Sequence, residues 1–172
     1  MINKWLYLIT LNLIIVSTNI TAQTIKDYIS INQPDGRYSV HGNGTVTDTY
    51  TGLMWKVCSE GQEWSSPATC SGTAASHNWQ QALELAGSKS FASFNDWRLP
   101  NIDELRSIVA YDRYDPAINL TIFSATPSAN YWSSSPYAND SNEAWLVYFD
   151  NGNTDFYNRD NKYFVRLVRG GQ

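Results

Sequence analysis

The sequence has few of the residues on which most enzyme active sites and metal centres depend. Its 172 residues include only two cysteines and two histidines. His41 and His77 are therefore the ordinary candidates for a general base near neutral pH, and neither stands in a motif with a serine, cysteine or aspartate partner. Residues 133–135 are a serine run and not the G-x-S-x-G turn of the hydrolases. We expect no enzyme activity, no catalytic residues and no cofactor.

A cluster of basic residues is also missing. Lys and Arg together number 12 against 16 Asp and Glu, which gives a net charge of −4. The basic residues near the end are spread among Asp155 and Asp160; they are Arg159, Lys162, Arg166 and Arg169. Because binding to nucleic acid phosphates needs clustered Lys and Arg, we expect no nucleic acid partner.

Long hydrophobic runs are absent as well. Lys4 precedes an apolar stretch over residues 5–16, and small or polar residues follow up to Ala22. This pattern is typical of a cleaved secretory signal peptide, here residues 1–22, and the run is short for a membrane span. It predicts a secreted, periplasmic or cell-surface protein with no membrane span after cleavage. An uncleaved N-terminal anchor is the alternative.

Removing 22 of the 172 residues leaves 150, which is enough for one domain with its own core. We interpret residues 23–43 as an N-terminal lead-in and residues 44–172 as the domain. Within the lead-in, residues 25–31 are expected to form one edge strand or a short helix.

The two cysteines, Cys58 and Cys70, are expected to form a disulfide, because exported chains with two cysteines usually pair them. Such a bridge closes a short loop and stabilises the fold by roughly 2–3 kcal/mol. A zinc or redox pair is the alternative. The spacing is too long for a CxxC motif, however, and His77 is the only histidine nearby.

Two short helices are predicted. Apolar residues recur at the helical period through residues 76–87, with Ser76 as the expected N-cap and Gly87 as the stop. A second helix is expected to begin at Asn101, where Glu104 can reach back in a capping box. Capping explains Glu104 without a catalytic role.

Several β-rich segments surround these helices. The predicted strands are residues 45–48, 53–57, 131–134, 144–149, 155–157 and 163–168. The strongest turn signal is Asn151-Gly152, which predicts a hairpin after residues 144–149. The order of elements favours an α+β fold, with two helices packed on a twisted antiparallel sheet and long loops. Trp55, Trp97, Trp132 and Trp145 are expected in its core, whereas Trp64 either caps the core or stacks on a ligand.

A polar and aromatic stretch between residues 137 and 161 is the candidate ligand-binding region. Asparagine offers two donors and one acceptor, and tyrosine offers a flat apolar face with a polar tip, which suits glycan hydroxyls or a peptide backbone. Arg159 could pair with a carboxylate or a sulfate. The predicted ligand-binding residues are Tyr137, Asn139, Asn142, Asn153, Asp155, Tyr157, Asn158, Arg159 and Asn161. Each of them could instead be only a turn residue.

Calcium is a further possibility, because residues 140–143 and 150–155 carry carboxylate and amide oxygens. Neither stretch matches an EF-hand loop. We expect no metal site.

Four blocks of sequence together resemble one family. They are Asp48 with residues 51–55, residues 96–100 with Glu104-Leu105, residues 131–134, and residues 165–171. In this order and spacing, the chain from about residue 40 to 171 resembles the Lcl C-terminal domain family, named for a bacterial collagen-like adhesin.

The resemblance implies a C-type-lectin-like fold, distantly related to the formylglycine-generating enzyme domain. It also implies an adhesin-like, non-catalytic domain that recognises a glycan, as the adhesin's domain recognises sulfated polysaccharide, or a protein ligand. The 172 residues contain no collagen-like repeat, and their acidic balance disfavours strong binding to sulfated chains. The alternatives are a structural or assembly subunit, for example a homo-oligomer, and an enzyme of the formylglycine-generating superfamily.

Overall fold

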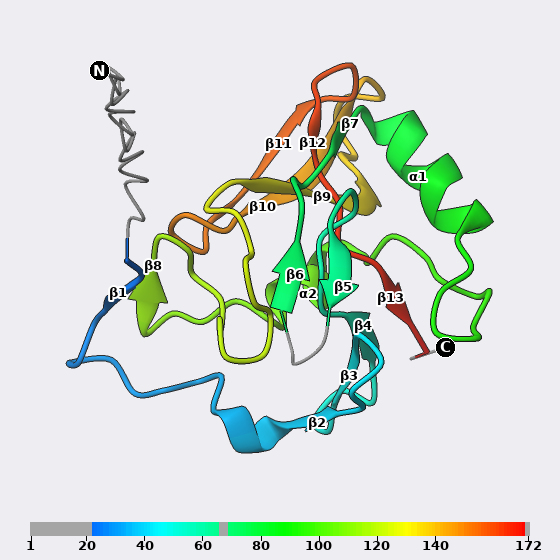
Figure 1. Cartoon of the computed structure of the whole chain (residues 1–172). Coiled ribbons are helices and arrows are strands. Elements are labelled where there is room, and N and C mark those ends of the chain that lie inside the picture. Colours follow the sequence, from blue (N-terminus) through cyan, green and yellow to red (C-terminus); the bar gives the residue numbers. More distant parts are fainter. Residues whose placement is uncertain (1–21, 66–68, 171–172) are drawn as a thin grey trace, which may run out of the picture.

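Short strands and two capped helices build the molecule. The computed structural model describes residues 22–65 and 69–170, so all but the last residue of the predicted signal peptide lies outside the described chain (Figure 1). The elements, in order, are β1 (Thr24–Ile25), η1 (Asp35–Arg37), β2 (Tyr38–Val40), β3 (Thr45–Asp48), β4 (Met54–Lys56), β5 (Glu63–Ser65), β6 (Thr69–Ser71), β7 (Ser76–His77), α1 (Trp79–Ser88), α2 (Ile102–Arg106), β8 (Arg113–Tyr114), β9 (Asn130–Pro136), β10 (Glu143–Tyr148), β11 (Thr154–Asn158), β12 (Tyr163–Phe164) and β13 (Val168–Arg169). No helix among the described residues is long and apolar enough to cross a membrane.

The largest sheet has the strand order β11-β10-β9-β12-β7. Its two faces are covered by different helices. Ala144 and Leu146 of β10 share an apolar cluster with Ala82 of α1, whereas Val147 shares another with Leu105 of α2. This alternation follows from the two-residue period of a strand.

The hairpin at the edge of this sheet forms as the Asn-Gly signal predicts. Strand β10 pairs with β11 in antiparallel register, and Trp145 lies opposite Phe156. Gly152 has a φ of +86°, and a Cβ there would lie 2.6 Å from Val109 Cγ1. Only glycine both adopts this positive φ readily and leaves room for the Val109 side chain. The turn therefore also packs this end of the hairpin onto the core.

A second sheet has the order β13-β4-β3-β2. Its centre is the predicted hairpin, in which Val46 pairs with Trp55. Strand β2 comes from the lead-in and pairs along β3, while β1 pairs with β8 (Figure 1). Residues 23–43 are therefore joined to the domain by strand pairing. They contain no α-helix, and their predicted edge strand is only two residues long.

The fold class is α+β, as predicted, but the expected single antiparallel sheet is wrong in detail. The described strands form four separate sheets, and β12 lies parallel to β9 at Phe164 and Tyr131. The predicted strand over residues 163–168 is likewise two strands in two sheets. Residues 165–167 between them are completely buried, and Arg166 turns into the core there.

Both helices begin at an asparagine. Asn101 accepts from the Glu104 amide at 2.8 Å, and the Glu104 carboxylate accepts from the Asn101 amide, which confirms the predicted capping box. In α1 the predicted cap Ser76 is wrong. Asn78 is the N-cap, with Gln81 completing the same reciprocal pair, because Ser76 is already paired with Phe164 in the sheet.

Indole rings fill the two apolar clusters. Trp55 and Trp132 are fully buried and Trp97 is nearly so, as predicted. Burying each large side chain contributes on the order of 2–3 kcal/mol. The prediction that Trp145 lies in the core is wrong. Its neighbours Ala144 and Leu146 point to the buried face of β10, and Trp145 is half-buried on the other face.

The predicted disulfide is present. Cys58 and Cys70 are bonded, with Cα atoms 5.5 Å apart and a separation of 12 residues along the chain. The bridge ties the end of the β3–β4 hairpin to β6. By the loop-closure argument it stabilises the fold by about 3 kcal/mol. Because the two sulfur atoms are bonded to each other, they do not form the zinc pair that was one alternative.

A buried ion pair fastens the lead-in to the domain. Arg37 donates through Nε to Asp48 Oδ1 at 2.7 Å and through Nη2 to Oδ2. Asp48 is fully buried. Burial alone would raise the pKa of Asp48, but hydrogen bonds from Arg37 and the Tyr50 amide outweigh it and hold this pKa below its ordinary value of 3.8.

This pair predicts acid sensitivity. Because the pKa of Asp48 is lower in the folded state, its stabilising contribution is complete above the ordinary value and is lost as pH falls below 3.8. Asp48→Asn should therefore lower the free energy of unfolding at pH 7 by about 3 kcal/mol, since Arg37 loses its buried counter-charge. Urea unfolding at several pH values should show a shallower loss of stability with acid in the variant. Equal slopes would contradict this role for the pair.

Candidate functional site

The nine predicted ligand-binding residues lie on the β9–β10–β11 region and its loops, but they do not form one site. Asn158 lies opposite Glu143, near the β9–β10 loop, whereas Asn153 lies in the turn beyond the other end of β11. At about 3.3 Å per residue, Asn153 is roughly 16 Å along the strand from Asn158. The Arg159 amide donates to the Asn142 carbonyl at 2.8 Å, so two of the predicted loops do meet. We call this end of the sheet the recognition end and define it as residues 137–143 and 157–163.

Tyrosines gather on the α1 side of the sheet: Tyr157 and Tyr163 belong to the recognition end, and Tyr148 lies further along β10, opposite Asn153. The Tyr148 hydroxyl lies 2.8 Å from the Tyr157 hydroxyl and 3.3 Å from Asp155 Oδ2. Tyr157 in turn contacts Tyr163 with ring centroids 5.8 Å apart, and Tyr163 packs on Trp132 at 4.8 Å. We call Tyr148, Tyr157 and Tyr163 the tyrosine cluster.

Two members of the tyrosine cluster, Tyr148 and Tyr163, hold their protons at neutral pH. Desolvation raises the pKa of Tyr148, and the neighbouring Tyr157 and Asp155 raise it further. Desolvation likewise raises the pKa of Tyr163. These hydroxyls are therefore neutral groups that can both donate and accept hydrogen bonds, and they are poor bases.

Arg159 is held in place beside this cluster. Its guanidinium carbon lies 4.1 Å from the centre of the Trp79 ring, and its Nε donates to the Glu143 carbonyl at 3.1 Å. The Arg159 carbonyl accepts from the Trp79 amide, the first residue of α1. The terminal Nη atoms of Arg159 make no hydrogen bond to other described residues, so they can bind a partner.

A second aromatic group lies on the opposite face of β11. Tyr137 stacks on Phe156 with centroids 3.8 Å apart and an interplanar angle of 6°, and Trp145 meets both rings edge-on. Phe156 and Tyr157 are consecutive strand residues and so point to opposite faces. The predicted set is thereby divided, with Tyr137 on one face and Tyr157 on the other. Sequence reasoning missed Phe156 and placed Trp145 in the core, although the Asn-Gly turn fixes the register that pairs them.

Some predicted asparagines serve the turns. Asn158 Oδ1 accepts from the Asp160 amide at 2.9 Å, and Asn139 Nδ2 donates to the Tyr137 hydroxyl at 3.2 Å. Asn161 Nδ2 reaches the Tyr163 hydroxyl at 3.5 Å. Asn158 retains both amide donors after this, so a turn role and a binding role are compatible.

A hollow of about 400 Å³ adjoins the recognition end. It is lined by Ser76, Ala129, Asn130, Lys162, Tyr163 and Phe164. Tyr163 belongs both to this hollow and to the tyrosine cluster. The recognition end is therefore a surface of aromatic faces, hydroxyls and amides beside a shallow recess.

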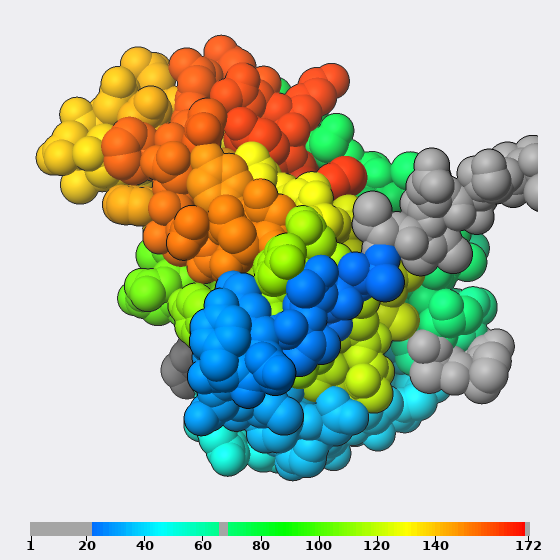
Figure 2. Space-filling model, turned by 90° about the vertical axis from the view of Figure 1, so that its left-hand side faces the viewer, coloured from blue at the N-terminus to red at the C-terminus, as the bar shows by residue number. Residues whose placement is uncertain are grey.

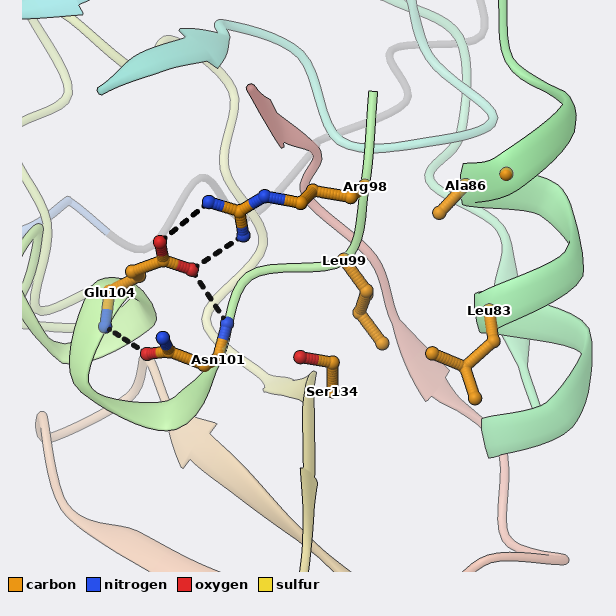
Figure 3. A pocket seen from close by; sticks show the side chains of 8 residues that line it. Leu83, Ala86, Arg98, Leu99, Asn101, Glu104 and Ser134 are labelled. Carbon is orange, nitrogen blue, oxygen red and sulfur yellow. Dashed lines mark hydrogen bonds and ion pairs between the residues drawn. The ribbon is translucent and has the colours of Figure 1, made fainter. Parts of the chain in front are cut away.

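The hollow in Figure 3, of about 470 Å³, involves one of the recognisable sequence blocks. Arg98 binds Glu104 through two hydrogen bonds of 2.7 and 2.6 Å on one side, Leu83 and Ala86 project from α1 on the other, and Leu99 lies between them. Burial raises the pKa of Glu104, but its bonds from Arg98 and from the Asn101 amide hold it below the ordinary value. Both ions therefore stay charged and paired at neutral pH, and the Glu104 carboxylate also caps α2.

Neither histidine ring has a carboxylate as hydrogen-bond partner among the described residues. His41 Nε2 contacts Thr47 Oγ1 at 2.8 Å on the surface. His77 accepts the Trp132 indole through its backbone carbonyl, and no carboxylate hydrogen-bonds its ring among the described residues. Within residues 22–65 and 69–170, no group of three or more His, Cys, Asp or Glu side chains is placed to hold a metal.

The geometry defines a class: a disulfide-linked α+β domain with a rigid aromatic scaffold and a polar, tyrosine-rich end. A comparison with known families identifies it further. The model of the Lcl C-terminal domain matches residues 44–169, and the chain belongs to this family. A comparison with curated proteins found no match. The matched region runs from just before β3 through β13 and includes the whole recognition end.

Proposed function

We propose that this chain is an exported, non-catalytic recognition domain that binds an extracellular glycan through its recognition end. We further propose that it has the C-type-lectin-like fold expected of its family, that its signal peptide directs it to the periplasm, the cell surface or the medium, and that it requires no metal or cofactor. Membership of the Lcl C-terminal domain family is consistent with an adhesin-like role.

The observation that carries this proposal is the tyrosine cluster. The Tyr148 hydroxyl contacts the Tyr157 hydroxyl and the Asp155 carboxylate, the Tyr157 ring contacts Tyr163, and Arg159, two residues beyond Tyr157, keeps its Nη donors free of other described residues. Sugars present both apolar ring faces and many hydroxyls, so aromatic faces bordered by donors and acceptors match their chemistry. Protein ligands would use the same groups, and the experiment below distinguishes the two.

Charge bears on the kind of glycan. Arg159 and Lys162 at the recognition end alternate with Asp155 and Asp160. A long sulfated chain needs a continuous basic surface, whereas this surface is mixed. We therefore propose a glycan recognised mainly through its hydroxyls, with sulfated polysaccharide as the less favoured ligand.

The direct test is a glycan array probed with the purified protein, with and without a chelator. The proposal predicts binding to a defined set of glycans that chelation leaves unchanged. Absence of glycan binding, together with capture of a protein ligand by the same surface, would contradict the glycan assignment.

The site itself is tested with the double variant Tyr157→Ala and Arg159→Ala. Binding should weaken at least tenfold, because the change removes an aromatic face and the only free guanidinium donors described at this end. Arg159→Lys, which keeps a cation over Trp79, controls for lost packing. Lys26→Met, at a lysine that lies over Tyr114 outside the recognition end and the tyrosine cluster, should bind normally. Wild-type affinity in a folded double variant would exclude the recognition end as the site.

A second candidate is an assembly subunit, favoured by exposed apolar side chains in the N-terminal segment. Ile25, Tyr28 and Ile31 are 56%, 81% and 64% exposed, and Tyr111 and Tyr114 lie on the segment that pairs with β1. Figure 2 shows this N-terminal segment, in blue, lying across one face of the molecule.

Sedimentation velocity tests this candidate. If this face joins copies of the chain, the wild type should form an oligomer that the variant Tyr28→Ser with Ile31→Ser reduces to a monomer, because the burial of both side chains is lost. Asn153→Ala is the matched control. A monomeric wild type across the concentration range would remove the candidate.

A further inference from the structure

A separate hollow of about 350 Å³ lies where four segments of the chain converge. It shares no residue with the recognition end. Lys56 comes from the end of β4, Trp64 from β5, Lys89 from the C-cap of α1, and Phe91 from the turn that follows. Its size falls at the lower end of the roughly 300–1,000 Å³ typical of small-molecule sites.

Two aromatic rings form the walls of this hollow, and Gly44 allows them to approach. A Cβ at Gly44 would lie 2.8 Å from Phe91 Cζ and 2.9 Å from Trp64 Cγ, and its φ is +83°. Trp64 is half-buried against the core. The sequence left open whether Trp64 caps the core or stacks on a ligand, and this position allows both.

Two ammonium groups lie beside these rings. Lys56 is 3% exposed, pairs with Glu60, and lies 4.6 Å from the centre of the Phe91 ring. Lys89 pairs with the other oxygen of Glu60 at 2.7 Å. Each ammonium has three donors and spends one on Glu60, whose two oxygens are both occupied.

Cations outnumber buried carboxylates here. Glu60 is 1% exposed and faces Lys56 and Lys89, and the buried Arg166 adds a further positive charge nearby. Burial lowers the pKa of Lys56, and although Glu60 opposes this, Lys89 and Arg166 lower it further. Glu63 also lines the hollow, but it is exposed and forms no ion pair among the described residues. An added anion would relieve the cation excess.

We propose that this hollow binds a small ring-shaped acid, with its ring against Trp64 and Phe91 and its carboxylate on the ammonium groups of Lys56 and Lys89. The ligand that fits these residues carries a single carboxylate attached to a ring. Its source is either a terminal hexuronic acid of a glycan or a free aromatic acid. The site is independent of the recognition end and adds a second binding activity to the chain.

The test uses three probes with the intact protein: glucuronic acid, benzoic acid and glucose. Binding is followed by the NMR shift of the Trp64 indole N–H, assigned by comparison with Trp64→Phe. At least one of the two acids should shift this signal and saturate, whereas glucose should not. Glucuronic acid alone indicates a glycan end, benzoic acid alone indicates an aromatic acid, and both indicate that the carboxylate dominates.

Variants of the lysine pair separate charge from structure. Lys89→Met should weaken acid binding at least tenfold, while Lys89→Arg should retain it, because the cation is what the carboxylate needs. Lys26→Met, at a lysine that lies over Tyr114 away from the hollow, is the matched control. The double variant at Tyr157 and Arg159 should bind the acids normally, which distinguishes this site from the recognition end.

Three results would overturn the proposal. The first is a shift of the Trp64 signal by glucose as strong as the shift by the acids. The second is the absence of a shift with either acid, and the third is wild-type affinity in folded Lys89→Met. Any one of them would show that the two lysines serve only to pair with Glu60.

Discussion

The structure depends on one buried cation. Arg166 is fully buried between β12 and β13 and donates to the backbone carbonyls of Lys56 and Val57 and to Thr126 Oγ1. Its guanidinium lies 4.9 Å from the centre of the Phe123 ring. Burial lowers the pKa of Arg166, but arginine keeps its charge in proteins, so the group must be satisfied where it lies. It therefore links the C-terminal chain to the end of β4 and to the loop before β9.

This linkage decides where the recognition end is placed. Because Arg166 turns inward, the chain leaves the five-stranded sheet after Phe164 and enters the four-stranded sheet at Val168. Strand β12 is then short and lies beside β9, which brings Tyr163 onto Trp132 and next to Tyr157. The aromatic scaffold thus fixes the tyrosine cluster in advance, and a ligand would not have to order it.

Local chemistry in the sequence predicted local structure well. The Asn101–Glu104 capping box, the Asn-Gly hairpin and the disulfide each depend on residues close in sequence, and the structure confirms all three. Order and spacing of four short blocks also sufficed for the family, which the match over residues 44–169 confirms.

Contacts between distant segments explain the errors. Ser76 is a good N-cap by type, but its pairing with Phe164, 88 residues later, places it in a sheet and leaves the cap to Asn78. Residues 163–168 look like one strand because nothing local shows that Arg166 must reach Thr126. The candidate site was predicted only in part for the same reason. The polar and aromatic composition of residues 137–161 is visible in the sequence. The division of Tyr137 and Tyr157 between two faces depends on the strand register of β10 and β11, which the composition does not show.

Hydrogen exchange on Arg166→Met tests the central claim most directly. If this cation links the sheets, the variant should lose about 3 kcal/mol or more of unfolding free energy, because several buried acceptors are left without a donor. Amide protection should fall together in β4, β9 and β12. A loss below about 1 kcal/mol, with protection changed only at residues 165–167, would contradict the account.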